Sequence, residues 1–356
     1  MNRAFNFAAG PAALPDEVLQ IAQRELMVYG DLGHSIMEMS HRSSTFIEVA
    51  ENSEATLRKL LGINDDFHVL FMHGGATMQF ALIPLNLATP DTSAEYAITG
   101  YWSKRACKEA QRIRTAHAVT ETDTYIAPES SWDRVDNSSY LYFTSNETLR
   151  GVQFHEFPSP EHAPLVCDMT SDFLTRPVDV SKFGLIYAGA QKNAGIAGIT
   201  IVIVRKELCR PLESNELHFL NYQTHVQYDS MYNTPSTFAW YVSGLYFDWI
   251  VKEGGVEVMQ QRAAQKSEVL YRVIDGSNFY QSPVAKEHRS VQNVTFYLPD
   301  ERQHHHFLKE ASKAKLKNLE GHREVGGIRA SLYNAVTQEG VNTLCDFMQD
   351  FENRHG

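Results

Sequence analysis

Residues 168–204 read DMTSDFLTRPVDVSKFGLIYAGAQKNAGIAGITIVIV and place one lysine, Lys192, between two apolar runs. The runs, residues 185–188 and 198–204, have the length and composition of buried strands. Small residues flank the lysine and leave room for a large flat ligand beside its amine. A lysine partly removed from water also titrates low enough to act as a nucleophile. The stretch therefore predicts an α/β fold in which a strand delivers a lysine suited to Schiff-base chemistry.

A third apolar run, residues 164–168, ends in a carboxylate, Asp168. Open α/β sheets bind their ligands at the carboxyl ends of their strands. An aspartate there can pair with a pyridinium nitrogen, which makes the ring of pyridoxal phosphate an electron sink while the lysine carries the cofactor. Taken singly, a lysine after a strand is mostly solvated and an aspartate after a strand is mostly a helix N-cap. The combination at this spacing favours a cofactor site.

Seven segments of the chain match one known family, in order and at the family's spacing. Residues 167–193 resemble the cofactor-lysine segment of the phosphoserine aminotransferases, which are pyridoxal-phosphate enzymes of fold type I. The other matching segments are FNFAAGPAALPDEVL, GHSIMEMSHRS, HGGATMQF, NETLRG, YNTPSTFAWYVSGL and GHREVGGIRASLYNA. The resemblance implies a large domain with a mostly parallel seven-stranded sheet between helices, and a smaller C-terminal α+β domain. It also implies amino transfer from L-glutamate to 3-phosphohydroxypyruvate in serine biosynthesis, and it leaves open a related step of pyridoxine biosynthesis.

Composition and charge agree with a soluble enzyme. The 356 residues are 43% hydrophobic and 21% charged, which suits a chain with two domains. A net charge of −11 argues against general binding to nucleic acid or acidic membranes, so an anionic substrate needs a local cluster of bases. The four cysteines form no CxxC pair, and the sequence carries neither a signal-peptide core nor an apolar run long enough to cross a bilayer. We therefore expect a cytoplasmic protein with reduced thiols, no disulfide framework and no bound metal.

The candidate cofactor residues follow strands or begin helices. Residues 68–72 are predicted to form a strand, which a glycine pair and a helix from about Met78 follow, and free N–H groups at such a helix start bind phosphate. A glycine turn is weak evidence alone, and tryptophans and turn threonines are more often structural. The resemblance implies a full set of cofactor contacts: Ala76, Thr77, Trp102, Thr148, Asp168, Gln191 and Lys192, with Asn233 and Thr234 reaching the cofactor phosphate of a partner subunit. It therefore also implies a homodimer with shared active sites.

The candidate substrate residues are bases that can grip two anions. Arg329 lies in a small, apolar strand, where an unpaired charge would be unfavourable, so it predicts a partner anion. The resemblance implies that Arg329 binds the substrate α-carboxylate, and that the phosphate or distal carboxylate is bound by His41, Arg42, His322 and Arg323. The chain departs from some family members at Thr77, where they carry an arginine that contacts the substrate phosphate. How this chain binds that phosphate without the arginine is left open.

The order of the segments predicts the domains. Strands and helices alternate from about residue 65 to 205, as in a mostly parallel sheet with helices on both faces. Residues 232–236 predict a helix start with Thr234 as the N-cap. Gly254 and Gly255 are the candidate boundary, which divides the chain into an arm (1–15), a large cofactor domain (16–254) and a small domain (255–356).

The sequence disfavours two other functions and one metal site. A desulfurase-like lyase on the same fold would need a reactive cysteine in an exposed glycine-rich loop, and none of the four cysteines lies in one. A binding protein that has lost catalysis is disfavoured because Lys192, Asp168 and the basic cluster are all present. The run His304-His305-His306 suggests a metal site, but consecutive residues of a helix point in different directions, so we expect a solvated face.

Overall fold

A seven-stranded sheet forms the centre of the larger part of the molecule. The computed structural model describes residues 3–160, 162–211 and 217–356. The strand order is β2-β10-β9-β8-β5-β3-β4; β10 runs antiparallel to both of its neighbours and the other pairs are parallel. The strands are β2 (Phe67–Met72), β3 (Ser93–Ile98), β4 (Ala116–Glu121), β5 (Ser138–Thr144), β8 (Leu165–Asp168), β9 (Leu185–Gly189) and β10 (Thr200–Arg205). The predicted mostly parallel sheet is therefore confirmed.

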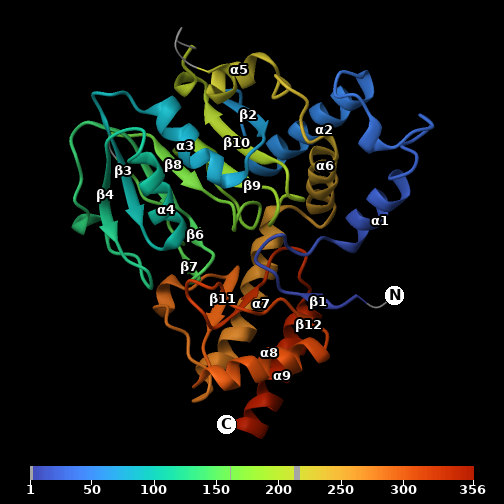
Figure 1. Cartoon of the computed structure of the whole chain (residues 1–356), viewed down its shortest axis with the longest axis vertical. Helices are drawn as coiled ribbons and strands as arrows, with labels where there is room; N and C mark the ends of the chain where they lie inside the picture. Colours follow the sequence, from blue (N-terminus) through green and yellow to red (C-terminus); the bar gives the residue numbers. More distant parts are fainter. Residues whose placement is uncertain (1–2, 161, 212–216) are drawn as a thin grey trace.

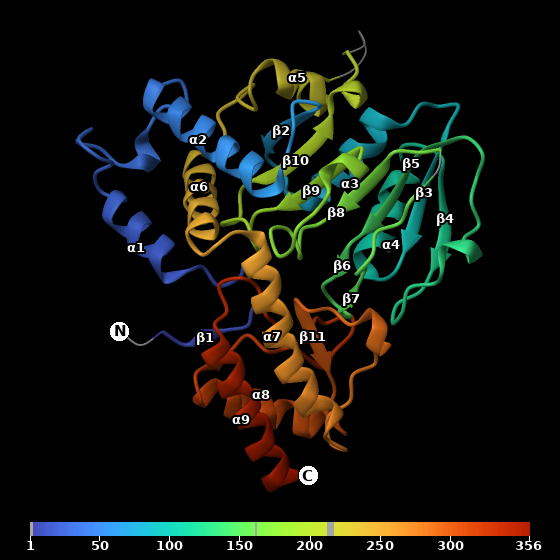
Figure 2. The same cartoon turned by 180° about the vertical axis from the view of Figure 1, so that it is seen from behind.

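Helices cover both faces of this sheet (Figures 1 and 2). They are α1 (Asp16–Glu25), α2 (Ser44–Leu61), α3 (Gly75–Leu87), α4 (Tyr101–Ala110), α5 (Tyr222–Gln227) and α6 (Thr237–Lys252). Successive side chains of a strand point to opposite faces of the sheet, so each strand contributes to a buried cluster on either face. Ile201 and Ile203 of β10 belong to one buried cluster, and Val202 and Val204 belong to the other.

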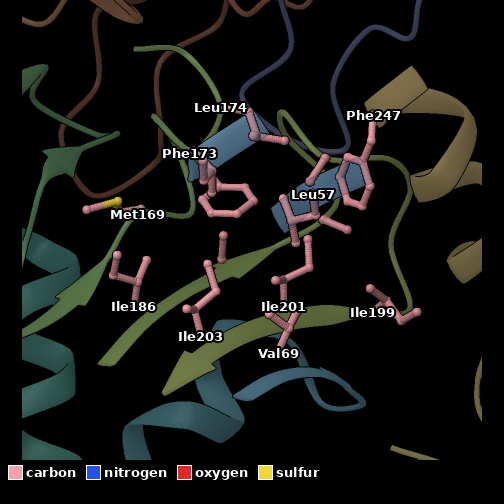
Figure 3. Packing of buried hydrophobic residues seen from close by; sticks show 14 of the residues in the cluster. Leu57, Val69, Met169, Phe173, Leu174, Ile186, Ile199, Ile201, Ile203 and Phe247 are labelled. Carbon is pink, nitrogen blue, oxygen red and sulfur yellow. The ribbon is translucent and has the colours of Figure 1, made fainter. Parts of the chain in front are cut away.

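The first of these clusters contains side chains from the sheet and from several helices, α1, α2 and α6 among them. Ile201 and Ile203 lie beside Val69 of β2, and Leu57 of α2 and Phe247 of α6 pack near them (Figure 3). The cluster on the opposite face joins the sheet to α3 and α4. Strands that are buried on both faces read as continuous apolar runs, which is why the sequence revealed them.

The C-terminal part has a hydrophobic core of its own. It contains α7 (Val256–Asp275), α8 (Glu301–Lys313) and α9 (Gln338–His355), with β11 (Asn293–Phe296) antiparallel to β13 (Ile328–Ser331). The N-terminal arm joins this part, because β1 (Phe5–Asn6) pairs with β12 (Leu316–Lys317) and Phe7 is fully buried in the same core. The domain boundary at Gly254 and Gly255 stays a prediction. No helix within the described ranges is both long and apolar enough to cross a membrane.

Two helix starts differ from the expected positions. Helix α3 begins at Gly75 rather than near Met78, because Gly74 adopts a left-handed conformation with φ 87° and lets the chain turn directly from β2 into the helix. Helix α6 begins at Thr237 with Ser236 at the N-cap, so the prediction of Thr234 as N-cap was wrong. The carbonyl of Thr234 instead lies 3.2 Å from Nε2 of His73, and this tertiary contact holds the residue outside the helix.

A buried lysine of α7 holds the segment after β13 in place. The Lys266 ammonium is 2.8, 2.8 and 2.9 Å from the carbonyl oxygens of Leu332, Tyr333 and Val336. The same segment carries Asn334, whose backbone N–H donates to the side chain of Asn193, next to Lys192. Lys266 therefore helps to fix the junction between the C-terminal part and the lysine segment.

Replacing Lys266 with methionine is expected to lower the free energy of unfolding by about 2 kcal/mol, because buried carbonyls lose a charged donor. Urea unfolding followed by circular dichroism measures this loss. The exposed Lys309 of α8 gives the matched control, and Lys309→Met is expected to change stability by less than about 0.5 kcal/mol. Equal stability of the Lys266→Met protein and the wild type would contradict the role given to the ammonium.

Candidate functional site

The carboxyl ends of six strands lie at one edge of the sheet. Strands β2, β3, β4, β5, β8 and β9 all run in the same direction, since β10 is antiparallel to both β2 and β9. Asp168 is the last residue of β8, and Lys192 follows β9 by three residues. Helices α3 and α4 begin directly after β2 and β3. The fold thus gathers a lysine, a carboxylate and two helix N-termini where α/β sheets bind ligands.

Lys192 is buried, with 8% of its surface exposed. Its ammonium donates a hydrogen bond of 2.7 Å to Oγ1 of Thr148, which directly follows the two-residue strand β6 (Asn146–Glu147). Burial lowers the pKa of Lys192 from 10.5 to about 8; the negative charge of Asp168 opposes this shift, and the positive charge of Arg329 adds to it. A lysine with this pKa is partly neutral near neutral pH and can therefore act as a nucleophile and as a proton carrier.

Asp168 is held by two donors. The backbone N–H of Thr170 donates to Oδ1 at 2.8 Å, and the hydroxyl of Tyr187 donates to Oδ2 at 2.9 Å. Because the Tyr187 proton is directed at the carboxylate, the hydroxyl of Tyr142, 2.8 Å away, must donate to the Tyr187 oxygen. Burial raises the pKa of Asp168, whereas these donors and the charge of Lys192 favour the carboxylate. The aspartate is thus fixed in orientation before any ligand arrives.

The N-terminal arm of the same chain lies against the lysine. The N–H of Ala12 donates to the carbonyl of Gln191 at 2.9 Å, and the hydroxyl of Tyr333 donates to the carbonyl of Ala9 at 3.0 Å. A Cβ atom on Gly10 would lie 3.2 Å from Cγ of Lys192, and Gly10 has a φ of 139°. The arm can therefore approach the lysine this closely only with a glycine at this position.

The two helix N-termini at this edge differ in their availability to an anion. The carboxylate of Glu147 accepts hydrogen bonds from the N–H groups of Trp102 and Ser103, at 3.0 and 2.8 Å, and so occupies the start of α4. No side chain caps the start of α3, and among the described residues the N–H groups of Ala76 and Thr77 have no acceptor. The start of α3 is therefore the one prepared for a phosphate.

Three predicted substrate residues come from the C-terminal part, and the charge of one of them, Arg329, acts on Lys192. Arg329, on β13, is half-buried, and its guanidinium has no hydrogen-bond or ion-pair partner among the described residues. Its charge contributes to lowering the pKa of both Lys192 and His322, whose pKa is lowered mainly by burial. The ring of His322 lies 5.7 Å from that of Tyr101, at the start of α4. Arg323 is mostly exposed and lies 3.6 Å from the carboxylate of Glu324.

Four predicted residues are not joined to Lys192 by any contact between the described parts of this chain. His41 and Arg42 precede α2, and Asn233 and Thr234 precede α6. Arg42, Asn233 and Thr234 are exposed, whereas Nε2 of His41 is buried without a partner.

Sequence reasoning missed the residues that support the site, namely Gly10, Tyr142, Glu147, Thr170 and Tyr187. The Asp168-x-Thr170 pattern was a usable signal, since an aspartate often accepts a hydrogen bond from the N–H two residues on. Tyr187 had no such local signal, because its place opposite Asp168 depends on the register of β8 and β9.

The cysteines do not offer a second nucleophile. Burial raises the pKa of Cys107 to about 11 and those of Cys209 and Cys345 to about 12, and it also raises that of Cys167. Thiols with raised pKa values carry little thiolate at neutral pH. This chemistry disfavours a desulfurase-like lyase.

The groups at the sheet edge match the functional groups of pyridoxal phosphate one by one. A nucleophilic lysine suits the aldehyde, an oriented aspartate suits the pyridine nitrogen, and an uncapped helix start suits the phosphate. The indole Nε1 of Trp102 is buried and has no partner among the described residues, as expected of a donor that pairs with a bound ligand. The fold and these groups define the class of protein as a lysine-dependent transferase of fold type I.

Comparison with known proteins narrows this class. The family model described as "Aminotransferase class-V" matches residues 4–344. A phosphoserine aminotransferase of Acinetobacter baumannii (strain ACICU) is 50% identical over 359 aligned positions, which cover 99% of this chain and 100% of that protein. The chain therefore belongs to the class-V aminotransferases, and within them to the phosphoserine aminotransferase family.

Two solved structures support this assignment. The phosphoserine aminotransferase of Bacillus circulans subsp. alkalophilus superimposes with a TM-score of 0.97 at 43% identity, covering 99% of both chains. The phosphoserine aminotransferase of Trichomonas vaginalis, with pyridoxal phosphate bound, superimposes with a TM-score of 0.94 at 36% identity, covering 98% of this chain and 100% of that one.

Replacing Tyr187 with phenylalanine is expected to weaken binding of pyridoxal phosphate roughly fivefold, because Asp168 loses one donor worth about 1 kcal/mol and becomes a weaker partner for a protonated ring nitrogen. Titration of the cofactor-free protein, followed by visible absorption, measures the affinity. Tyr246→Phe is the matched control, because Tyr246 is also fully buried but its hydroxyl has no partner in the described part of the chain. An equal loss in both variants would mean that Tyr187 acts only through packing.

Proposed function

We propose that this protein transfers the amino group of L-glutamate to 3-phosphohydroxypyruvate, giving 2-oxoglutarate and O-phospho-L-serine, a step of L-serine biosynthesis. Membership of the phosphoserine aminotransferase family supports this proposal. The observation that carries it is the unpaired Arg329 guanidinium, which is close enough for its charge to lower the pKa of Lys192. A cation beside a reactive lysine is what an α-carboxylate substrate requires.

Pyridoxal phosphate, when bound, supplies the electron sink that stabilises negative charge on the substrate α-carbon. In our proposal Lys192 holds its aldehyde carbon and Asp168 its ring nitrogen. The N–H groups of Ala76 and Thr77 would bind its phosphate, and Trp102 would stack on its ring. Gln191 and Thr148 would complete the set, with the Thr148 hydroxyl as a donor to the cofactor's phenolic oxygen.

Lys192 would also move a proton during the transfer. Burial lowers the pKa of its amine to about 8, so the amine could accept the proton of the substrate α-carbon and give it up again. Because a catalytic base is most effective with a pKa near the working pH, the burial that makes Lys192 a nucleophile also suits it to this transfer.

The two substrates share an α-carboxylate and a distal anion. Arg329 binds the α-carboxylate in our proposal, since a guanidinium can grip a carboxylate with two parallel hydrogen bonds. The distal carboxylate or phosphate is bound by the bases His41, Arg42, His322 and Arg323. His322 and Arg323 come from the same C-terminal part as Arg329, whose charge acts on His322.

We further propose that the enzyme is a homodimer in which Asn233 and Thr234 reach the cofactor phosphate of the partner subunit. Both side chains are exposed, as they must be to cross an interface. Large apolar side chains are also exposed along one segment of the chain: Leu26, Met27, Val28, Leu32, Met37 and Ile47. Such a concentration is typical of an interface that is buried in the assembled protein.

The cellular compartment of the enzyme is part of the same proposal. Four free cysteines, three of them buried, suit a reducing compartment, and we place the protein in the cytoplasm.

The phosphorylated hydroxythreonine step of pyridoxine biosynthesis uses a related substrate, so activity on it remains a prediction. We also propose the division into an arm (1–15), a large domain (16–254) and a small domain (255–356).

Absorption spectra test the reaction. The purified protein with pyridoxal phosphate is expected to be yellow, to bleach with L-glutamate, and to regain its colour with 3-phosphohydroxypyruvate. A yellow protein that is indifferent to both substrates would contradict the proposed function while leaving the cofactor site intact.

Arg329→Gln is expected to lower kcat/KM for both substrates about 100-fold, because a charged, paired contact to the α-carboxylate is lost. The yellow colour is expected to persist. Arg302→Gln changes an exposed arginine of α8 and provides the matched control. If Arg329→Gln affected only the phosphorylated substrate, its assignment to the α-carboxylate would be wrong.

Mixing two inactive variants tests the shared site. One carries Lys192→Ala, and the other carries Asn233→Ala with Thr234→Ala. Random reassembly into dimers is expected to restore about one quarter of the wild-type sites, because each mixed dimer contains one site with both parts intact. If all of these residues served the same chain's site, the mixture would stay inactive.

A further inference from the structure

The three consecutive histidines of α8 have three different surroundings. Nε2 of His304 accepts the backbone N–H of Leu298 at 2.9 Å, so His304 is a structural residue. His305 is exposed. His306 lies one turn before Glu310 on the same helix, with its Nε2 3.0 Å from Oε1 of that glutamate. These different surroundings agree with the expectation that the three consecutive histidines cannot bind one metal ion together.

His306 and Glu310 meet a further histidine, which comes from the last turn of α9. The rings of His306 and His355 have centroids 4.6 Å apart, at 63° to each other. One potential ligand atom from each of His306, Glu310 and His355 lies within 4.8 Å of the others. Two helices therefore bring two imidazoles and one carboxylate to a single point on the surface.

We propose that His306, Glu310 and His355 form a binding site for a divalent transition-metal ion, with Zn²⁺ the best match. Two imidazoles and a carboxylate are ligands that Zn²⁺ prefers, and water can take the fourth position. Ligand atoms around tetrahedral zinc lie about 3.3 Å apart, given zinc–nitrogen bonds of about 2.0 Å. The pair on α8 already meets this spacing, and His355 reaches it by a small movement of a partly exposed side chain.

The charges around the three ligands favour a cation. Arg354 lies 2.9 Å from the other oxygen of Glu310, Oε2, and 3.0 Å from Oδ2 of Asp350. Its Nη1 also lies 3.4 Å from Nε2 of His355, a contact that a metal ion bound at this nitrogen would replace. The two carboxylates outnumber the one guanidinium, so the cluster carries a net negative charge when the imidazoles are neutral. By occupying Oε2, Arg354 also orients Glu310 and leaves Oε1 directed at the site, as supporting residues of metal sites do.

A metal here would link α9 to α8. Gln303 of α8 already donates to the carbonyl of His355 at 3.1 Å, so the last turn of α9 is attached at this place. Figures 1 and 2 place this end of α9 away from the seven-stranded sheet, so the site is separate from the edge that carries Lys192. We therefore assign the metal a role in holding the C-terminus and none in the chemistry.

The test uses the enzyme with pyridoxal phosphate bound and without an affinity tag. Zn²⁺ is titrated in competition with a coloured chelator, and Co²⁺ is used in parallel because its visible spectrum reports the coordination geometry. The wild type is expected to bind one ion at this site. His306→Ala and His355→Ala are each expected to weaken binding at least tenfold, in line with the loss of a ligand.

His305→Ala is the matched control, since it removes a neighbouring imidazole of the same helix from outside the cluster. It is expected to leave the affinity and the Co²⁺ spectrum unchanged. Circular dichroism and transaminase activity are expected to stay at wild-type values in all three variants, which excludes unfolding as the cause. No binding by the wild type, unchanged binding by His355→Ala, or an equal loss in His305→Ala would overturn the proposal.

Discussion

The burial of Lys192 opposite Asp168 is the constraint on which the rest of the site depends. An isolated buried ammonium is unfavourable and tends to lose its proton, and this lowers the pKa of Lys192 to about 8. The carboxylate of Asp168 limits that shift, and the donors on Asp168 keep it charged in turn. The same burial therefore produces a nucleophile, a proton carrier and an oriented partner for a ring nitrogen.

The surrounding structure maintains this pair from three directions. The sheet aligns Asp168 with Tyr187 on neighbouring strands, the arm brings Gly10 against the lysine, and the C-terminal part supplies Arg329. Lys266 and Asn334 fix the junction of the C-terminal part with the lysine segment. A site assembled from three separate stretches of chain needs such a junction, because small displacements of catalytic groups reduce rates strongly.

The sequence predicted the features that depend on residues close together in the chain, such as strands and the residues at their ends. Apolar runs that end in Lys192 or Asp168 gave the strands and the edge of the sheet, because strands buried on both faces read as continuous hydrophobic stretches. The predicted start of α6 was wrong because capping preferences describe an isolated helix, whereas the carbonyl of Thr234 contacts the ring of His73 in the folded chain. The Tyr187–Asp168 contact could not be foreseen, since it depends on strand register. The contact between His306 and His355 depends on how α8 packs against α9, so the sequence alone could not predict it either.

The titration of Lys192 itself tests the central claim most directly. The rate at which pyridoxal phosphate combines with the cofactor-free protein is measured against pH, with N-acetyl-lysine methylamide as the reference amine. Only the neutral amine reacts, so we predict that the rate for the protein rises with pH and levels off above about pH 8, whereas the rate for the reference amine keeps rising. A rate that keeps rising up to about pH 10.5, as for an ordinary solvated lysine, would contradict the account.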